Sequence, residues 1–187
     1  MGSRVNILLT KLHGVVIVET APIVDHRGTF TRLFCESELA DVICNRRIVQ
    51  INYSRTVRVG AVRGLHLQRA PHAEMKLVRC LKGRVFDVAV DLRTGSQSYL
   101  QWHAEELTPE NQRMLIIPEG CAHGFQALEP DSELLYLHTS PYSPAAESGV
   151  RFDDARLGIP WPLPAVDLSP RDLLLPTLDA SFSGFPA

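Results

Sequence analysis

The chain has 187 residues, of which 45% are hydrophobic and 21% are charged, and its net charge is -2. This composition fits one globular domain over residues 1–187 with a substantial core, and the lack of a basic excess argues against a nucleic-acid partner. The apolar runs are only a few residues long, so we expect no transmembrane helix, no signal peptide and a cytoplasmic protein.

The first sixty residues are predicted to form short strands. Residues 7–18 are rich in β-formers and break at Gly14, and residues 29–34 resume the pattern after the turn sequence around Arg27. A short helical turn is expected over residues 36–40, with Ser37 as its cap. Residues 48–54 alternate, which places Gln50 and Asn52 on the same face of a strand.

The middle of the chain continues in the same way. Strands are predicted over residues 63–68, 76–81 and 85–92, and the turn at Lys82-Gly83 predicts that the last two form a β-hairpin. Further strands are expected over residues 101–107, 113–117 and 133–139, and residues 171–175 show the one weak helical period.

Many short strands with regularly spaced turns predict an all-β sandwich or closed barrel. The C-terminal segment from residue 141 onward is rich in prolines, which cannot donate to a central ladder. They include Pro141, Pro144, Pro160, Pro162, Pro164, Pro170 and Pro176. We therefore expect this segment, with its short helical stretch, to wrap the barrel rather than to extend it.

Two residues of the middle strands could carry chemistry. His66 shares a strand face with Gly64 and Gln68, which suits a cavity wall, although a lone histidine is more often structural. Lys76 shares the face of Val78, which looks inward. A cation there could stabilise an enolate oxygen, unless the side chain reaches water at the strand end.

Two later residues add to this set. Tyr136 shares a face with His138, and a phenol in a cavity can donate a proton to a carbanion, although an isolated barrel tyrosine is more often structural. Asp172 is an ordinary surface aspartate unless the C-terminal segment brings it to a histidine. It would then fix the tautomer of the ring and raise its basicity.

Residues 118–123 read PEGCAH and resemble the second half of the cupin signature, a turn that places His123 inside a jelly-roll barrel. The first half normally carries HxH followed by a glutamate, whereas this chain has Gln68 at the second histidine. Glutamine is a poor ligand for a transition metal, so no metal is expected. A metal site made of His72, Glu74 and His123 stays open as the alternative.

The cysteines have no CxxC spacing and are expected to be reduced core residues. They are Cys35, Cys44, Cys80 and Cys121.

Several segments, in order, resemble the family of dTDP-4-dehydrorhamnose 3,5-epimerases. They include Asp25-x-Arg27-Gly28, Gln50-x-Asn52-x-Ser54, Arg63-Gly64-Leu65-His66-x-Gln68, Lys76-Leu77-Val78-Arg79, Pro118-Glu119-Gly120-x-Ala122-His123, Tyr142-Ser143-Pro144 and Trp161-Pro162. The resemblance implies a cupin-type jelly roll without cofactor or metal, usually a homodimer. It also implies a nucleotide-sugar substrate with a C4 ketone, which acidifies the neighbouring C–H groups.

The resemblance also implies catalytic roles. His66 would be the base and Asp172 its partner, Lys76 would stabilise the O4 enolate, and Tyr136 would be the acid on the far face of the sugar. The family implies that one or both of C3 and C5 are inverted, and it leaves this choice open.

Substrate-binding roles follow in the same way. Arg27 and Arg63 would hold the diphosphate, Gln50 and Asn52 would contact the nucleotide end, and the Arg27 region can reach the partner's site. The same motifs place two further residues at the substrate, His123 and Tyr142. A regular strand would point Arg63 away from the face of His66, so a bend or the strand start must intervene.

The chain departs from the best-known members at two places. Arg32 stands where they have a glutamate, and Pro141 replaces one tyrosine before Tyr142. The nucleotide pocket is therefore expected to differ. Two other functions stay open, a metal-dependent cupin oxygenase or isomerase, and a sugar-binding cupin without catalysis.

Overall fold

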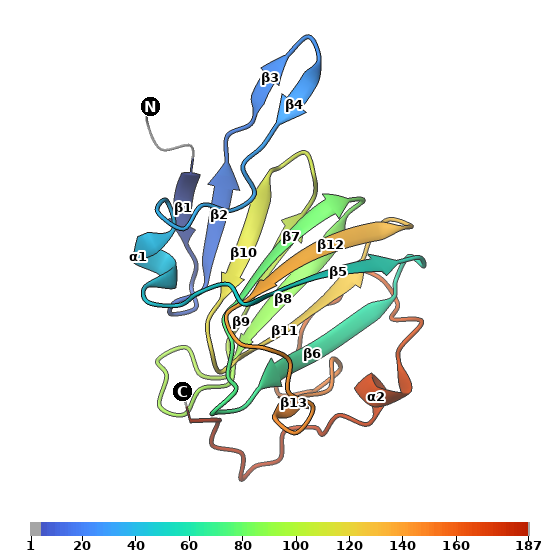
Figure 1. The fold of residues 1–187 in the computed structure, drawn as a ribbon. Coiled ribbons are helices and arrows are strands. Elements are labelled where there is room, and N and C mark those ends of the chain that lie inside the picture. Colours follow the sequence, from blue (N-terminus) through green and yellow to red (C-terminus); the bar gives the residue numbers. More distant parts are fainter. Residues whose placement is uncertain (1–4, 187) are drawn as a thin grey trace.

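The computed structural model describes residues 5–186, and Figure 1 shows two antiparallel sheets that face each other. The six-stranded sheet runs in the order β1 (Val5–Leu9), β2 (Val16–Thr20), β10 (Arg113–Ile117), β7 (Lys76–Lys82), β12 (Ser132–His138), β5 (Gln50–Thr56). The five-stranded sheet runs in the order β13 (Glu147–Gly149), β6 (Val62–Gln68), β11 (Cys121–Ala127), β8 (Val85–Asp91), β9 (Trp102–Leu107). The predicted all-β jelly roll is confirmed.

Three smaller elements complete the fold. Strands β3 (Ile23–Asp25) and β4 (Gly28–Phe30) form a separate hairpin that projects away from the two sheets (Figure 1). The helices are α1 (Ala40–Ile43) and α2 (Pro170–Leu173). Within residues 5–186, no helix has the length and apolar character to cross a membrane.

Three clusters of apolar side chains cover the two sheets. One cluster, which includes Val78, Leu115 and Phe125, fills the space between the sheets. A second joins the outer face of the six-stranded sheet to Leu39 and Ile43 around α1. A third packs residues of the proline-rich segment on the outer face of the five-stranded sheet; its members from this segment include Val150, Leu157, Ile159, Trp161, Leu178 and Phe182. The prediction that this segment wraps the barrel is confirmed.

The predicted hairpin of residues 76–81 and 85–92 is wrong. The two strands are β7 and β8, and they belong to different sheets. The turn at Gly83, with a φ of 76°, is a corner between the sheets, and it packs so tightly on Ser132 that a Cβ would lie 2.5 Å from the Ser132 Oγ. A corner and a hairpin show the same alternation along the sequence. Only the identity of the partner strands distinguishes them.

The predicted helical turn is also displaced. The α1 helix begins at Ala40 rather than near residue 36, and its N-cap, Leu39, makes no side-chain hydrogen bond. The proposed cap, Ser37, instead contacts the Cys35 sulfur at 3.2 Å. Burial of Leu39 and Ile43 against the six-stranded sheet therefore positions this turn, rather than capping.

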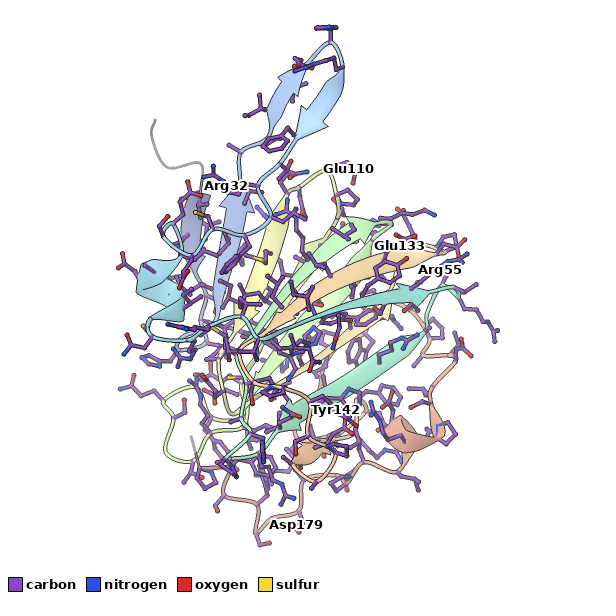
Figure 2. All side chains as sticks on the ribbon, in the orientation of Figure 1. Arg32, Arg55, Glu110, Glu133, Tyr142 and Asp179 are labelled. Atoms are coloured by element: carbon purple, nitrogen blue, oxygen red, sulfur yellow. The ribbon has the colours of Figure 1, made fainter. Side chains whose placement is uncertain are left out.

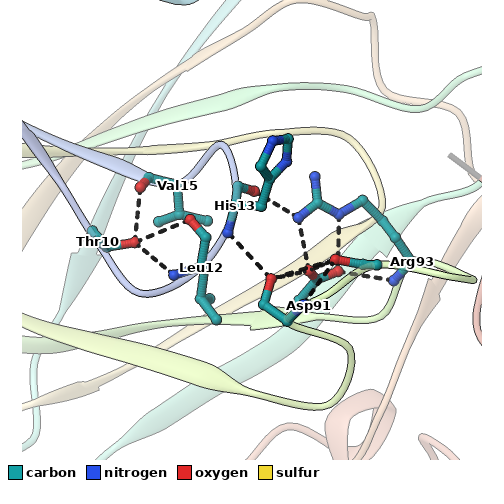
Figure 3. A network of polar contacts seen from close by, with 8 residues as sticks. Thr10, Leu12, His13, Val15, Asp91 and Arg93 are labelled. Atoms are coloured by element: carbon teal, nitrogen blue, oxygen red, sulfur yellow. Dashed lines mark hydrogen bonds and ion pairs between the residues drawn. The ribbon is translucent and has the colours of Figure 1, made fainter.

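A buried polar network ties the β1–β2 loop to the end of β8 (Figure 3). The Asp91 carboxylate accepts two hydrogen bonds from the Arg93 guanidinium, at 2.8 and 2.7 Å, and one from the Arg93 backbone N–H at 3.0 Å. It also accepts the Ser96 and Ser98 hydroxyls, at 2.5 and 2.6 Å. Arg93 also donates to the His13 carbonyl at 2.6 Å. Burial alone would raise the pKa of Asp91, but these hydrogen bonds lower it to about 2.

The four cysteines are free thiols, as expected. Cys80 and Cys121 are core residues, and burial raises the pKa of each thiol to about 12. Cys44 is exposed, so the expected core position is wrong for that residue.

Candidate active site

A cavity of about 1310 Å³ opens between the two sheets. It exceeds the roughly 300–1,000 Å³ of ordinary small-molecule pockets, and it can therefore take a ligand as long as a nucleotide sugar. The six-stranded sheet contributes Asn52, Lys76 and Tyr136 to its walls, and the five-stranded sheet contributes Arg63, His66 and His123.

His66 and Asp172 form a close pair on one wall of the cavity. The His66 Nε2 lies 2.6 Å from the Asp172 Oδ1, although the two residues are 106 positions apart. Asp172 is 3% exposed, and α2 holds it because Ser169 caps this helix by accepting the Asp172 N–H. Burial opposes ionisation of Asp172, but the His66 and Ser169 hydrogen bonds hold its pKa below the usual value. With Nε2–H donated to the carboxylate, Nδ1 carries the lone pair of a base.

A register shift explains how Arg63 reaches the same cavity as His66. His66 pairs with His123, and Arg63 pairs with Phe125, so three steps on β6 match two steps on β11. This extra residue is a β-bulge, which points Arg63 and His66 the same way. Gly64 in the bulge has a φ of 130°, and a Cβ there would lie 2.5 Å from the Gly124 Cα. The Arg63 Nε donates to Thr56 at 3.1 Å.

Lys76 is a buried cation on the opposite sheet. It is 7% exposed, and its Nζ lies close to the Glu74 carboxylate and 3.4 Å from the His66 carbonyl. The other Glu74 oxygen accepts the Gln68 N–H at 3.1 Å. The lysine therefore stays in the cavity instead of extending to water, because a buried carboxylate faces it.

Tyr136 reaches the cavity from β12. Its ring packs edge-on to His123, with 6.0 Å between centroids, and stacks with His138 at 6.1 Å. Its hydroxyl lies 3.4 Å from the Ser54 Oγ. Burial raises the pKa of Tyr136 well above the usual value, so the phenol keeps its proton at neutral pH and can act as an acid.

His123 lies inside the barrel, as the cupin-like turn predicts, and its Nε2 is 2.8 Å from the buried Asp87 carboxylate. Burial raises the pKa of Asp87 above its usual value. The Gln68 side-chain amide is engaged by backbone groups, since its Nε2 donates to the His72 and Pro141 carbonyls. No three metal-ligating side chains gather anywhere in residues 5–186. The alternative site of His72, Glu74 and His123 is thus not assembled, because other partners engage Glu74 and His123.

A chain of hydrogen bonds lines the outer end of the cavity. The Tyr142 N–H donates to the Gln50 Oε1 at 2.9 Å, and the Gln50 Nε2 donates to the Asn52 Oδ1 at 3.1 Å. The exposed Tyr142 hydroxyl lies 3.0 Å from Glu147, which also pairs with Arg171 at 2.8 Å. Figure 2 shows Tyr142 on the lower part of the molecule, near the C-terminal segment.

One predicted residue lies outside the cavity. Arg27 is at the tip of the β3–β4 hairpin, where its guanidinium pairs with Asp25 at 2.5 Å, and the chain does not fold it back to its own cavity. Arg32, the first of the two expected departures from the family, does not line the cavity either and pairs with Glu38 at 3.1 Å (Figure 2). All the other predicted site residues line this one cavity.

The cavity also contains polar residues that the sequence did not indicate as catalytic or substrate-binding, and Glu74 among them was considered only for the alternative metal site. They include Ser54, Glu74, His138, Glu147 and Arg171. The alternation of β12 places His138 beside Tyr136, and this signal could have identified it. Glu74 and Glu147 lie outside the predicted strands, so no pattern indicated their orientation.

An antiparallel jelly roll with a histidine–carboxylate pair, a buried lysine and a protonated phenol in one cavity defines a cupin-type protein equipped for acid–base chemistry. Residues 9–180 match the family model described as dTDP-4-dehydrorhamnose 3,5-epimerase. The chain belongs to this family, and it is therefore an isomerase.

Individual relatives agree with this assignment. The chain is 43% identical to a dTDP-4-dehydrorhamnose 3,5-epimerase of Sinorhizobium fredii, over 82% of this chain and 80% of the relative. It is 41% identical to a dTDP-4-dehydrorhamnose 3-epimerase of Streptomyces niveus, over 79% and 72% of the two chains. A crystal structure of the Legionella pneumophila 3,5-epimerase, in complex with dTDP-4-keto-L-rhamnose, has a TM-score of 0.90 at 37% identity and covers 97% of each chain.

Proposed function

We propose that this enzyme epimerises a dTDP-4-keto-6-deoxy sugar, inverting C3, C5 or both through an enolate. The observation that carries the proposal is that His66 of one sheet, paired with Asp172 of α2, and Tyr136 of the facing sheet line the same cavity. Inversion requires a base on one face of the sugar and an acid on the other, which this arrangement supports. The ligand in the Legionella pneumophila structure has the same chemical class.

The reaction would proceed by proton exchange beside the C4 ketone. The His66 Nδ1 takes a proton from the carbon, and the Asp172 carboxylate stabilises the imidazolium that forms. The electrons move onto O4, where the Lys76 ammonium stabilises the enolate. Tyr136 then donates its proton to the opposite face of the carbon, and exchange with solvent restores both groups. These steps need no cofactor.

The remaining contacts would bind the rest of the substrate. The Arg63 guanidinium suits the diphosphate, since its planar fork matches phosphate oxygens. Gln50, Asn52 and Tyr142 would contact the nucleotide at the outer end of the cavity, and His123 would line the sugar site. Arg27 points away from its own cavity, so we propose a homodimer in which it reaches the partner's diphosphate. A nucleotide-sugar substrate supports the proposal of a cytoplasmic enzyme.

Solvent exchange tests the base. The wild-type enzyme, incubated with dTDP-4-keto-6-deoxyglucose in D2O, should introduce deuterium at C3, C5 or both, and NMR of the product shows which. His66→Ala should lower the uptake by at least about a hundredfold, because it removes the base. A sugar-binding protein without catalysis would give no deuterium in the wild type, and uptake that survives in the variant would contradict the role of His66.

Tyr136→Phe tests the acid separately. His66 would still remove a proton and return a deuteron to the same face, so deuterium should appear in recovered substrate. The inverted product should fall by at least about a hundredfold, because no acid faces the other side of the carbon. Equal losses of deuterated substrate and inverted product would argue against Tyr136 as the acid.

A further inference from the structure

His138 is a cavity residue that the proposed chemistry does not use. It lies on β12 two residues after Tyr136, and both side chains line the cavity. The two rings are nearly parallel, with an interplanar angle of 15° and centroids 6.1 Å apart. This offset stacking is a favourable aromatic arrangement. Together with the edge-on His123 ring, it places the phenol in contact with two imidazoles.

The His138 ring is itself held by neighbouring side chains. The Asn52 Nδ2 lies 3.4 Å from the His138 Nε2, and the Asn52 Oδ1 accepts the Gln50 amide at 3.1 Å. Gln50 is anchored in turn by the Tyr142 backbone N–H. The register of the sheet also places His138 between Gln50 on β5 and Lys76 on β7. The sheet thus fixes the backbone of His138, and Asn52 fixes the Nε2 atom of its ring.

The protonation state of His138 agrees with this arrangement. Burial first, and then the nearby charges of Lys76 and His123, lower its pKa to about 4. The ring is therefore neutral at neutral pH. A neutral ring can accept the Asn52 amide hydrogen at Nε2, and it adds no second cation beside Lys76.

We propose that His138 is a positioning residue for Tyr136, which holds the phenol at the angle that returns a proton to the far face of the carbanion. The inference rests on the role of Tyr136 in the proposed function. Among residues 5–186, the Tyr136 hydroxyl has one hydrogen-bonding contact, with Ser54 at 3.4 Å, so the ring stack provides much of what orients the phenol. Proton transfer is sensitive to this orientation, because the donor must lie within hydrogen-bond reach of its acceptor.

Two substitutions distinguish the contribution of the His138 ring from that of its polar nitrogen atoms. His138→Gln keeps polar atoms and removes the ring, whereas His138→Phe keeps a ring and removes the nitrogens. The measurement is the ratio of inverted product to deuterium in recovered substrate, in D2O with dTDP-4-keto-6-deoxyglucose. We expect this ratio to fall about five- to twentyfold in His138→Gln and to stay within about twofold of wild type in His138→Phe. The surface substitution His72→Gln is the control and should leave the ratio unchanged.

The ratio is taken within one sample, so a loss of folded enzyme lowers both quantities and leaves it unaffected. An unchanged ratio in His138→Gln overturns the proposal, and so does an equal fall in His138→Phe. If the wild type itself shows neither deuterium nor inversion, the proposed function fails instead. A wild type that inverts the sugar, with both variants sharing one ratio, retains the function and removes the role of His138.

Discussion

The buried Lys76 ammonium depends on the carboxylate of a single residue, Glu74. Lys76 and Glu74 are both more than nine-tenths buried, and an isolated charge at either position would be strongly unfavourable. Their pairing allows the ammonium to remain in the cavity, and the second Glu74 oxygen fixes the backbone of β6 through Gln68. A single side chain therefore links the two sheets at the reacting end of the cavity.

Glu74→Ala should destabilise the protein by about 3 kcal/mol, because it leaves a buried ammonium without its partner. Glu74→Gln should cost less, since its amide oxygen still accepts the Gln68 N–H. The control is Glu133→Ala, which removes the partner of the exposed Lys82 and should cost less than about 1 kcal/mol. Urea unfolding measures all three, and equal losses in Glu74→Ala and Glu133→Ala would contradict the importance of the buried pair.

Among the strands, β6 has the irregularity on which the geometry of the site depends most. Its bulge at Gly64 gives Arg63 and His66 a common direction. The alternation of residues 63–68 predicts the strand correctly, but a bulge is a mismatch between two strands and has no signal in one of them. The same reason underlies the wrong hairpin of β7 and β8, because local alternation does not identify the partner strand.

Gly64→Ala tests the bulge. A Cβ at this position would collide with the Gly124 Cα and the His123 carbonyl, so we expect a loss of about 3 kcal/mol and a fall in solvent exchange. Gly28 offers a matched control, since it has the same φ of 130° and no atom within 4 Å of its Cβ position. Gly28→Ala should show only the backbone strain, about 1–2 kcal/mol. Thermal unfolding that ranks the two variants equally would show that the close approach is unimportant.

At the scale of the whole molecule, the strand pattern and the prolines are enough to predict an all-β sandwich or barrel with an outer C-terminal wrap, and the resemblance to the family narrows this to a jelly roll. Alternation places Lys76 on an inward face, and it gives His66 and Tyr136 each a strand face shared with polar or small residues. Their meeting with Asp172 has no local signal, because the contact joins residues 106 positions apart, and only the resemblance to a family indicated it. His138 and Glu74 needed the assembled cavity to acquire a role.

The Asp91 network makes the stability of the whole fold pH-dependent. Its folded pKa of about 2 lies below the ordinary 3.8, so its contribution is complete above about pH 4 and is lost as the pH falls toward 2. The shift corresponds to about 2 kcal/mol. Urea unfolding at about pH 5 and about pH 2.5 should show a larger loss in the wild type than in Asp91→Asn. Identical losses in the two proteins would exclude Asp91 as a source of the acid sensitivity.

The distance along the chain between His66 and Asp172 has a consequence for biosynthesis. A ribosome makes β6 and every other strand of both sheets before it reaches α2. The walls of the cavity can therefore form while the base still lacks its carboxylate. The His66–Asp172 pair is complete only once α2 has docked, so we expect proton removal to begin after this last step of folding.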